Sequence, residues 1–542
     1  MTEAPTVQMF TKPDCVFCQA AKRVLTGAGI GYQELDTASA ARLADSAVYF
    51  SGRLTVPQVF AGGRLIDAPG DLERLAAAGR LPDVVGSAAG ELPLDSVPPA
   101  ELARGAEDVP LADHLPKLDG THDPDPEAWP LLHFYRRLFG FWPNTMAYLY
   151  RWPTAYKLFV YCQNVATVPM ARKIVGTPMV SLIGYGASRA HGCSYCTTHA
   201  ITLFEGLDVD VKALEAAREG DTDPANPFGP FEVAVVELSA RIARNTVTDE
   251  AVEAVRATAP QARFGEPDPD PRRAVVAVTQ MASTMGFFNV FNDLVGLATE
   301  GDMARTALSK GIEAGRHAVE EANPDNLSHD LPEGGPTIPE MVARYEARVG
   351  DVGAYTTEHL GLTPAWMRVW PEAARKLHAY MYVTLMGGDG EAVIGAELKH
   401  LMARVSAVAR DHGYLAAVEG FLAARAATDA DRAVERVRHA YQAAIGRPES
   451  MALFDERERS ALRLAWLSAQ IPLVTPQRFV EPLVTQYDDR ELIELIVACS
   501  TAALVQRFCS VHKPEIEPAV REFLSEHDLD TDPLDIRYPV GR

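Results

Sequence analysis

Two pairs of cysteines carry the residue types and spacing that could do chemistry. The segment "KPDCVFC" places Cys15 and Cys18 three residues apart, and "HGCSYCTTH" places Cys193 and Cys196 at the same spacing, with His199 three residues further on. A thiolate can bind a metal, attack a disulfide or attack a peroxide, and a neighbouring thiol can then form a disulfide with it. The sequence therefore predicts either metal sites or redox-active dithiols at these two places.

The elements expected around the first pair favour the redox interpretation. The apolar run "VQMF" before the pair predicts a strand, and "QAAKRVLTGAGI" after it has the apolar spacing of a helix. Cys15 is then expected at a helix N-terminus, where free amide groups and the helix dipole favour a thiolate, and Lys12 adds a positive charge. A zinc clip would need a second pair of ligands nearby, which this stretch of sequence does not supply.

Residues 1–81 resemble a glutaredoxin over the full length of such a domain. Their predicted order of strand, helix, strand, helix, two strands and helix is that of the α/β thioredoxin-like fold. The segment "TVP" supplies a turn at Thr55, Val56 and Pro57 beside the dithiol, with the proline expected in cis. The resemblance implies Cys15 as the nucleophile and Cys18 as the resolving thiol.

The expected substrate-binding residues of this domain are Lys12, the Thr55 to Pro57 turn and Asp71. Glutaredoxins have a Gly-Gly pair and paired acidic residues that hold glutathione. The present chain reads "IDAPGDL", which places Asp67 and Ala68 at the two glycines and keeps only Asp71 of the acids. Another low-molecular-weight thiol or a protein reductase therefore fits the sequence as well as glutathione does.

The second pair has a spacing that brings three reactive side chains together. Positions 193, 196 and 199 advance by three residues, so on a helix their side chains fall within about 120° of one another. His199 is then placed to accept a proton from Cys196 or to donate one to it. Two alternatives remain at this point. One is a zinc site with His191 as the fourth ligand, and the other is a packing role for all three side chains.

The segment around the second pair resembles the carboxymuconolactone decarboxylase and alkylhydroperoxidase-D-like superfamily of all-α domains. The resemblance implies Cys196 as the peroxidatic thiol, Cys193 as the resolving thiol, His199 in a proton relay, and no cofactor besides the redox-active disulfides. The relay glutamate of the family is replaced by Ser181 in this chain. The expected substitutes are His191, Tyr195 and Glu205.

The chain is expected to be multidomain, with one α/β domain followed by two all-α repeats. The expected boundaries are residues 1–81 for the glutaredoxin-like domain, 82–124 for an acidic, Pro-rich linker, 125–325 for the first helical repeat and 335–530 for the second. The two repeats are expected to be one helical unit present twice, because several segments of the first resemble segments of the second in the same order.

Only the first repeat carries the dithiol. Matching "SRAHGCSYC" to "ARDHGYLAA" places Tyr414, Ala417 and Gly420 opposite the two cysteines and the histidine. The second repeat is therefore predicted to be catalytically silent and to serve as a packing neighbour for the first. The remaining cysteines, Cys162, Cys499 and Cys509, lie in apolar helices and are predicted to be buried free thiols.

Composition limits the partners. A formal net charge of −22 disfavours nucleic acid and anionic membranes, because a polyanion would be repelled. No signal sequence and no uninterrupted apolar run long enough to cross a bilayer is expected, so the chain is predicted to be soluble and cytoplasmic. Seven cysteines in 542 residues are too few for a secreted disulfide framework. A homo-oligomer is compatible with the sequence.

Two dithiols in one chain predict a thiol-dependent oxidoreductase. The first hypothesis is a peroxidase that reduces a hydroperoxide, or another small oxidised substrate, at Cys193 and Cys196 and is recycled by Cys15 and Cys18, with electrons from a thiol or a reductase. The alternatives are a dithiol oxidoreductase acting on a specific protein or small-molecule disulfide, a non-redox lyase or isomerase of the decarboxylase type, and a redox-sensing scaffold.

Overall fold

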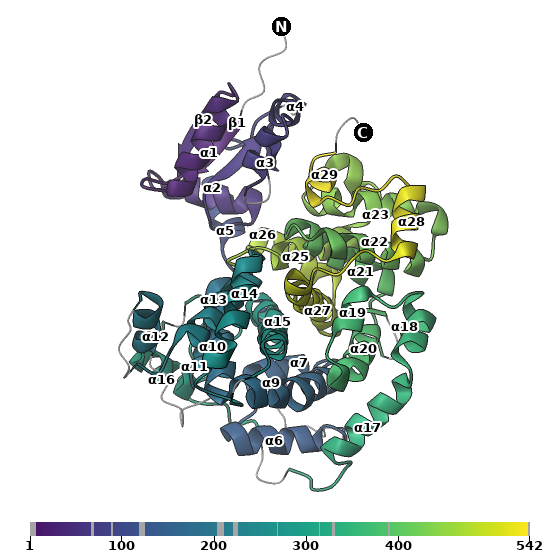
Figure 1. Cartoon of the computed structure of the whole chain (residues 1–542). Helices are drawn as coiled ribbons and strands as arrows, with labels where there is room; N and C mark the ends of the chain where they lie inside the picture. Colours follow the sequence, from purple (N-terminus) through teal and green to yellow (C-terminus); the bar gives the residue numbers. More distant parts are fainter. Residues whose placement is uncertain are drawn as a thin grey trace.

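The structure of the chain is a computed structural model in which a small α/β domain lies against a large helical body (Figure 1). It describes residues 7–66, 70–87, 90–118, 125–202, 211–220, 226–267, 269–313, 315–327, 331–387 and 391–539. The division into an α/β part and an all-α part agrees with the sequence-based prediction.

The N-terminal domain is a four-stranded sheet with helices on its faces. The strand order is β2-β1-β3-β4, in which β1 pairs with β2 in parallel and with β3 antiparallel, and β3 pairs with β4 antiparallel. The predicted order of elements is confirmed. The strands are β1 (Val7–Thr11), β2 (Tyr32–Asp36), β3 (Gln58–Ala61) and β4 (Arg64–Ile66), and the helices are α1 (Val16–Gly27), α2 (Ala41–Ser51) and α3 (Asp71–Ala77).

The described part of the expected linker is structured and docked on the body. It contains α4 (Leu81–Gly86), α5 (Pro99–Ala106) and the short helix η1 (Leu111–His114). The Asp108 carboxylate accepts hydrogen bonds from Arg316 and from the Thr475 amide, and Val109 N donates to Thr475 O at 3.0 Å. Its apolar residues Leu102 and Leu111 are fully buried. The linker is therefore not the free tether that its Pro-rich composition indicates.

The first repeat contains thirteen helical segments within the described residues. They are α6 (Trp129–Phe139), α7 (Asn144–Leu149), α8 (Pro153–Val160), the π-helix η2 (Tyr161–Thr167), α9 (Val168–Val175), α10 (Thr177–His191), α11 (Ser194–Thr202), α12 (Val211–Arg218), α13 (Pro230–Arg244), α14 (Asp249–Thr258), η3 (Ala259–Gln261), α15 (Pro271–Val295) and α16 (Gly301–Ser309).

The second repeat follows the same plan of shorter helices around one long central helix. Its helices are α17 (Ile338–Val349), α18 (Val352–Leu360), α19 (Ala365–Val369), α20 (Glu372–Gly387), α21 (Ala396–Ala409), α22 (Gly413–Ala426), α23 (Ala430–Ala444), α24 (Pro448–Met451), α25 (Glu456–Ser468), α26 (Gln477–Gln486), α27 (Asp489–His512), α28 (Pro518–Glu526) and α29 (Pro533–Arg537).

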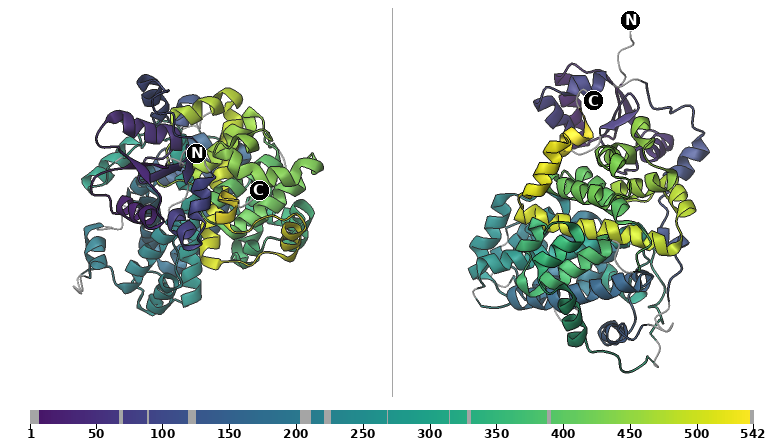
Figure 2. Two further views of the ribbon diagram at one scale, coloured as in Figure 1. Left: turned by 90° about the horizontal axis from the view of Figure 1, so that it is seen from above. Right: turned by 90° about the vertical axis from the view of Figure 1, so that its right-hand side faces the viewer.

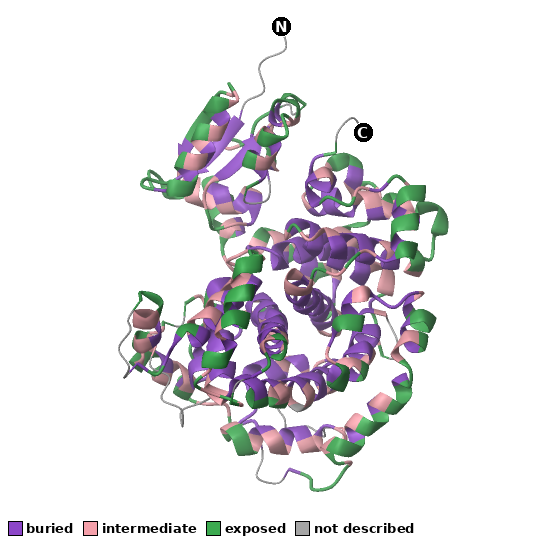
Figure 3. Cartoon of the chain, in the orientation of Figure 1, coloured by how far each residue is buried: buried purple, intermediate pink, exposed green. Residues whose placement is uncertain are grey.

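The long helices α15 and α27 pack along each other where the two repeats meet, and one hydrophobic core runs from the first repeat into the second (Figures 1 and 2). By length and composition alone both helices could span a membrane, but 83% of the apolar window of α15 and 100% of that of α27 are buried inside the fold. Figure 3 shows both as buried central helices. They are core helices, and each repeat supplies the apolar surface that covers the other.

The structure corrects the alignment of the two repeats at the cysteine motif. Helix α10 is capped at its C-terminus by Gly192, which has a positive φ of 95°. Helix α21 is followed by Asp411, which has a positive φ of 58°. The next residue caps the following helix in both repeats: Cys196 N donates to Cys193 Sγ and Leu415 N donates to His412 Nδ1, each at 3.4 Å. The matching "HG" dipeptides are thus two positions out of register.

In the corrected register, the second-repeat counterparts of Cys193, Cys196 and His199 are His412, Leu415 and Val418. The residues named from sequence, Tyr414, Ala417 and Gly420, lie two positions beyond them. Helix capping decides this register, because the left-handed residue and the capping side chain fix where the second helix begins.

Candidate active site

The first dithiol lies at the N-terminus of α1, as predicted. Cys15 is the N-cap residue, its Sγ accepts a hydrogen bond from Cys18 N at 3.1 Å, and the two sulfurs form a disulfide. The Val56–Pro57 peptide is cis, which confirms that expectation, and Val56 O lies 3.9 Å from Cys15 Sγ. The predicted docking turn therefore borders the nucleophile.

The predicted substrate-binding residues of this domain divide into an open group and a closed one. Lys12 and Thr55 are exposed, and Val56 and Pro57 are half-buried. Asp71 is fully buried, and Arg537 of α29 donates a hydrogen bond to each of its carboxylate oxygens. In this conformation the Asp71 carboxylate is therefore not open to a small thiol. Positions 67 and 68 lie outside the described residues.

The second dithiol repeats the capping arrangement of the first. Cys193 directly precedes α11, its Sγ accepts from Cys196 N at 3.4 Å, and its carbonyl accepts from Thr197. Asn292 of α15 donates from Nδ2 to Cys196 Sγ at 3.1 Å. Such a donor favours the charged form of a sulfur. The two thiols are free, and both are buried.

A histidine, a glutamate and a tyrosine form a polar cluster at α11, the helix that carries Cys196. His199 Nε2 lies 3.0 Å from Glu300 Oε2, while Tyr195 OH and Asn144 N both donate to Glu300 Oε1 at 2.8 and 2.7 Å. The His199–Glu300 contact is at ion-pair distance, but it is not an aligned hydrogen bond. His199 Nε2 and Glu300 Oε2 are therefore buried polar atoms with hydrogen-bonding capacity to spare.

The charge of Glu300 raises the pKa of His199. Burial lowers the pKa of His199, but the Glu300 carboxylate more than offsets this, and the pKa of His199 is raised from its ordinary value. Burial likewise raises the pKa of Glu300, and His199 more than offsets it, so that pKa is lowered. His199 Nδ1 lies 2.9 Å from Tyr195 O, an acceptor. Each ring nitrogen therefore has an acceptor near it, and the Glu300 carboxylate favours the charged form of the ring.

A second polar cluster lies beside Cys193. The Cys193 sulfur, an Asp293 oxygen and a His317 nitrogen lie within 4.8 Å of one another, a spacing that a metal ion can use. Both ring nitrogens of His317 already have partners, however, with Nδ1 2.7 Å from Leu297 O and Nε2 2.9 Å from Asp293 Oδ1. His317 and Asp293 therefore bind each other, and neither ring nitrogen of His317 is open to an ion.

Burial sets the protonation of the groups nearest Cys193. It raises the pKa of the Cys193 thiol well above its ordinary value. It also lowers the pKa of His191 to about 3, with a further contribution from Arg507. His191 is therefore neutral at neutral pH. Its Nδ1 faces Arg507 Nη2 at 3.2 Å, which leaves the proton on Nε2, 3.6 Å from Asp293 Oδ2.

The structure separates the relay candidates. Tyr195 contacts Glu300 and lies in the cluster at α11, whereas His191 lies in the cluster beside Cys193. Glu205 lies outside the described residues. Ser181 is buried, and its hydroxyl has no hydrogen-bond partner among the described residues. His199 makes no hydrogen bond to either sulfur in the described part of the chain, because both of its nitrogens face other partners.

Sequence reasoning missed four residues of the site, namely Asn292, Asp293, Glu300 and His317. For the first two, a signal was present in "FFNVFNDLVG", where adjacent polar residues interrupt an apolar helix. Glu300 and His317 come from segments beyond the end of α15, and no local pattern places them beside the dithiol. Only the tertiary fold brings them there.

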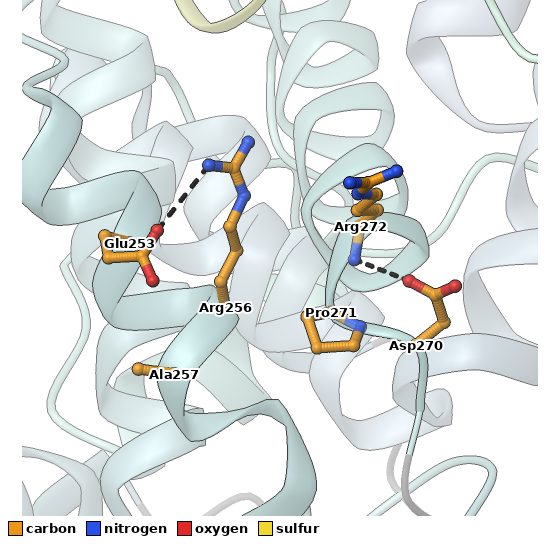
Figure 4. Close-up of a pocket in the computed structure, with 6 residues that line it drawn as sticks. All are labelled: Glu253, Arg256, Ala257, Asp270, Pro271 and Arg272. Carbon is orange, nitrogen blue, oxygen red and sulfur yellow. Dashed lines mark hydrogen bonds and ion pairs between the residues drawn. The ribbon is translucent and has the colours of Figure 1, made fainter.

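Two hollows in the structure lie away from both dithiols. One, of about 640 Å³, lies between α14 and the start of α15 (Figure 4). Glu253 and Arg256 pair across 3.6 Å at its edge, and Asp270 caps α15 through Arg272 N at 2.8 Å. The other, of about 860 Å³, lies between the α/β domain and the second repeat. Neither is lined by a cysteine, so neither belongs to the candidate site.

The sheet order, the dithiol capping α1 and the adjacent cis-proline define a thioredoxin-fold domain built for thiol–disulfide chemistry. The family model "Glutaredoxin" matches residues 7–66. Glutaredoxin 3 of Escherichia coli K12 is 37% identical over 75 residues, which cover 14% of this chain and 90% of that protein. The chain therefore belongs to the glutaredoxin family through its N-terminal domain.

Two further similarities concern a curated protein and a solved structure. The hybrid peroxiredoxin hyPrx5 of Haemophilus influenzae is 42% identical over 72 residues, which cover 13% of this chain and 30% of that protein. The chain thus spans less than a third of the length of this relative. Among solved structures, the apo debrominase Bmp8 aligns with 33% of this chain and 91% of its own, at 20% identity and a TM-score of 0.28.

Proposed function

We propose that the chain is a cytoplasmic thiol peroxidase whose Cys196 reduces a hydroperoxide, with Cys193 as the resolving thiol and Cys15 and Cys18 as the internal reductant. The observation that carries the proposal is the division of the site into two clusters. Cys196 has a hydrogen-bond donor on its sulfur and His199, paired with Glu300, three residues further along the same helix, whereas Cys193 lies within 4.8 Å of the Asp293 carboxylate. The two sulfurs are thus prepared for different roles.

The first step needs a thiolate and a proton for the leaving oxygen. The Cys196 thiolate attacks the terminal oxygen of the hydroperoxide, the O–O bond breaks, and a sulfenic acid and an alkoxide form. His199, held protonated by Glu300, supplies the proton that turns the alkoxide into an alcohol. Its Nε2 is the buried donor that lacks an aligned partner, which supports this role.

The second step forms the disulfide. The Cys193 sulfur attacks the sulfenic sulfur of Cys196 and displaces hydroxide, which combines with the thiol proton of Cys193 to leave as water. Because the pKa of Cys193 is raised, this thiol stays protonated until a neighbouring base takes its proton. The Asp293 carboxylate lies within 4.8 Å of the sulfur and is placed to accept this proton.

The third step returns two electrons to the Cys193–Cys196 disulfide by thiol–disulfide exchange. Both dithiol regions contact one short segment of the second repeat. Arg53 of the α/β domain donates to Gln470 at 2.7 Å, and Pro472 lies 3.2 Å from where a Cβ on Gly192 would be. This shared contact supports exchange within one chain.

Exchange also requires a movement, because Cys193 is 0% exposed and Cys196 is 3% exposed. Neither sulfur is therefore open to attack in this structure. A thiolate can attack a disulfide only along the line of the two sulfurs, so one of the buried sulfurs must become accessible first. Release of the docked α/β domain is one movement that could provide access.

Peroxide consumption by the purified full-length chain, with dithiothreitol as the donor, tests the proposal. We expect turnover of an organic hydroperoxide by the parent protein and loss of turnover in Cys196→Ser. The matched control is Cys499→Ser, which replaces another buried free thiol of the helical body. Equal turnover by the Cys196→Ser protein would contradict the role of Cys196, and no turnover by the parent protein would favour a dithiol oxidoreductase acting on another disulfide.

A further inference from the structure

Arg507 belongs to the second repeat, but its side chain reaches the dithiol site of the first. It lies on α27 and is 2% exposed. Its Nη1 donates to Asn289 Oδ1 at 3.0 Å and to Ala282 O at 3.3 Å, and its Nη2 contacts His191 Nδ1 at 3.2 Å. All three partners belong to the first repeat.

The residues that contact Arg507 lie on the same helices as the groups that position the two sulfurs. His191 precedes Cys193 by two residues at the end of α10, and Asn289 lies one helical turn before Asn292, whose amide donates to Cys196 Sγ. Asn289 also donates to Ser188 Oγ at 2.9 Å, which joins α15 to α10. Arg507 therefore ties together the two helices that position the dithiol.

The backbone of α15 leaves room for this side chain. A Cβ at Gly286 would lie 2.8 Å from Arg507 Cδ and 2.9 Å from Ala503 O, so a larger residue would force the two long helices apart. The glycine therefore allows α27 to approach closely enough for the guanidinium to pass into the first repeat.

The charge of Arg507 has no carboxylate partner within ion-pair distance among the described residues. Its contacts are an amide oxygen, a backbone carbonyl and an imidazole. The pKa of Arg507 is lowered to about 9, mainly by burial and also by Arg410, while the charges of Cys196, Cys193 and Asp293 act in the opposite direction. A buried cation without a counter-ion favours any nearby group that can become an anion.

We propose that Arg507 is a positioning residue of the dithiol site, supplied by the second repeat, whose guanidinium fixes His191 and Asn289 and favours the thiolate of Cys196. The second repeat is then a functional part of the site, although it has no dithiol of its own. The inference rests on the proposed function only in taking Cys196 as the reactive thiol.

The reactivity of Cys196 towards iodoacetamide as a function of pH tests this role without any peroxide. The titratable and charged groups around the dithiol are His191, His199, Asp293, Glu300, His317, Arg410 and Arg507, and the test variants change only the last. Peptide mass spectrometry of the reduced full-length chain reports alkylation at Cys196 separately from that at the other cysteines.

Arg507→Gln removes the charge and keeps hydrogen-bond donors. We expect the midpoint of its alkylation profile to move to higher pH and the rate at pH 7 to fall about tenfold, the effect of one pKa unit. Arg507→Lys keeps the charge and should restore most of the rate. Arg507→Met is the second charge-free variant and carries the same expectation as the glutamine.

The matched control is Arg404→Gln. Arg404 is an equally buried arginine of the second repeat whose hydrogen bonds go to the carbonyls of Ala416 and Val437, within its own repeat. Its substitution should leave the midpoint unchanged. A parental midpoint in folded Arg507→Gln, or a shift as large in Arg507→Lys or Arg404→Gln, would overturn the proposal. Absence of peroxide turnover by the parent protein, together with the expected alkylation shift in Arg507→Gln, would instead count against the proposed peroxidase function alone.

Discussion

Arg537 and Asp71 form a buried ion pair that joins helix α29 to the first turn of α3 in the glutaredoxin domain. Arg537 Nε lies 2.8 Å from Asp71 Oδ2, and Nη2 lies 2.6 Å from Oδ1. Arg537 also donates to Val408 O and Asp411 Oδ1, and so connects α21 of the second repeat to the same point. The C-terminal helix α29 therefore fixes the glutaredoxin domain to the second repeat.

Arg537→Met should destabilise the folded chain strongly. The substitution leaves the Asp71 carboxylate buried without a partner, and breaking a buried pair in this way costs about 3–5 kcal/mol. A lower urea concentration at the unfolding midpoint is the expected result. The double variant Arg537→Met, Asp71→Leu should recover much of the loss, because no buried charge remains. Arg104→Met, at an exposed arginine 3.8 Å from Glu481, is the control and should change stability by less than about 0.5 kcal/mol.

The role of Cys196 can be tested by trapping its oxidised form. In Cys193→Ser no resolving thiol remains, so a hydroperoxide should leave a sulfenic acid at Cys196 that a dimedone probe labels. Cys196→Ser should give no comparable label at Cys193, because burial and the Asp293 charge keep that sulfur protonated. Labelling in the opposite pattern would show that the two roles are reversed.

The pH dependence of peroxide turnover should depend on Glu300. A group that donates a proton is active below its pKa, so the alkaline limb of activity reports the loss of the His199 proton. The Glu300 carboxylate raises the pKa of His199 against the opposing effect of burial. In Glu300→Gln only the hydrogen bond to Tyr195 O still opposes the effect of burial, and the alkaline limb should move to lower pH.

The second repeat offers a matched control for that experiment. Tyr414 OH donates to Glu517 Oε1 at 2.8 Å, and Ala365 N donates to the same oxygen, just as Tyr195 and Asn144 contact Glu300. The counterpart of His199 there is Val418, which cannot titrate. Glu517→Gln should therefore leave the alkaline limb in place. If it moves the limb as far as Glu300→Gln does, a general structural effect accounts for both.

The sequence predicted what depends on local pattern. The glutaredoxin domain was predicted from its strand and helix order, and the position of Cys15 followed from the strand and helix on either side of it. The correct register of the second repeat was not predicted, because the "HG" dipeptide gave a better match of letters than the caps at Gly192 and Asp411. A left-handed conformation at an aspartate has no strong signal in a single sequence.

The clusters around the second dithiol depend on contacts between distant segments. Glu300, the N-cap residue of α16, contacts His199, and His317, which follows the C-terminus of α16, contacts Asp293. Arg507 comes from the other repeat altogether. The linker shows the same limit, because its composition predicts a flexible tether, whereas Asp108 is held by Arg316 and Thr475. Docking of this kind depends on the partner surface, which local composition does not describe.

The last prediction concerns electron transfer between the two dithiols. In Cys18→Ser, Cys196→Ser, mild oxidation with diamide should join Cys15 to Cys193, because each has lost the thiol with which it would otherwise pair. The linked fraction, measured by peptide mass spectrometry, should not depend on protein concentration if the exchange occurs within one chain. Because both thiols of the second site are buried, adding Arg537→Met, which breaks the ion pair that holds the glutaredoxin domain on the helical body, should speed the linkage. If neither protein forms it, while the control Cys15→Ser turns over peroxide at the parental rate with a glutathione or protein donor, the two dithiols do not act in series.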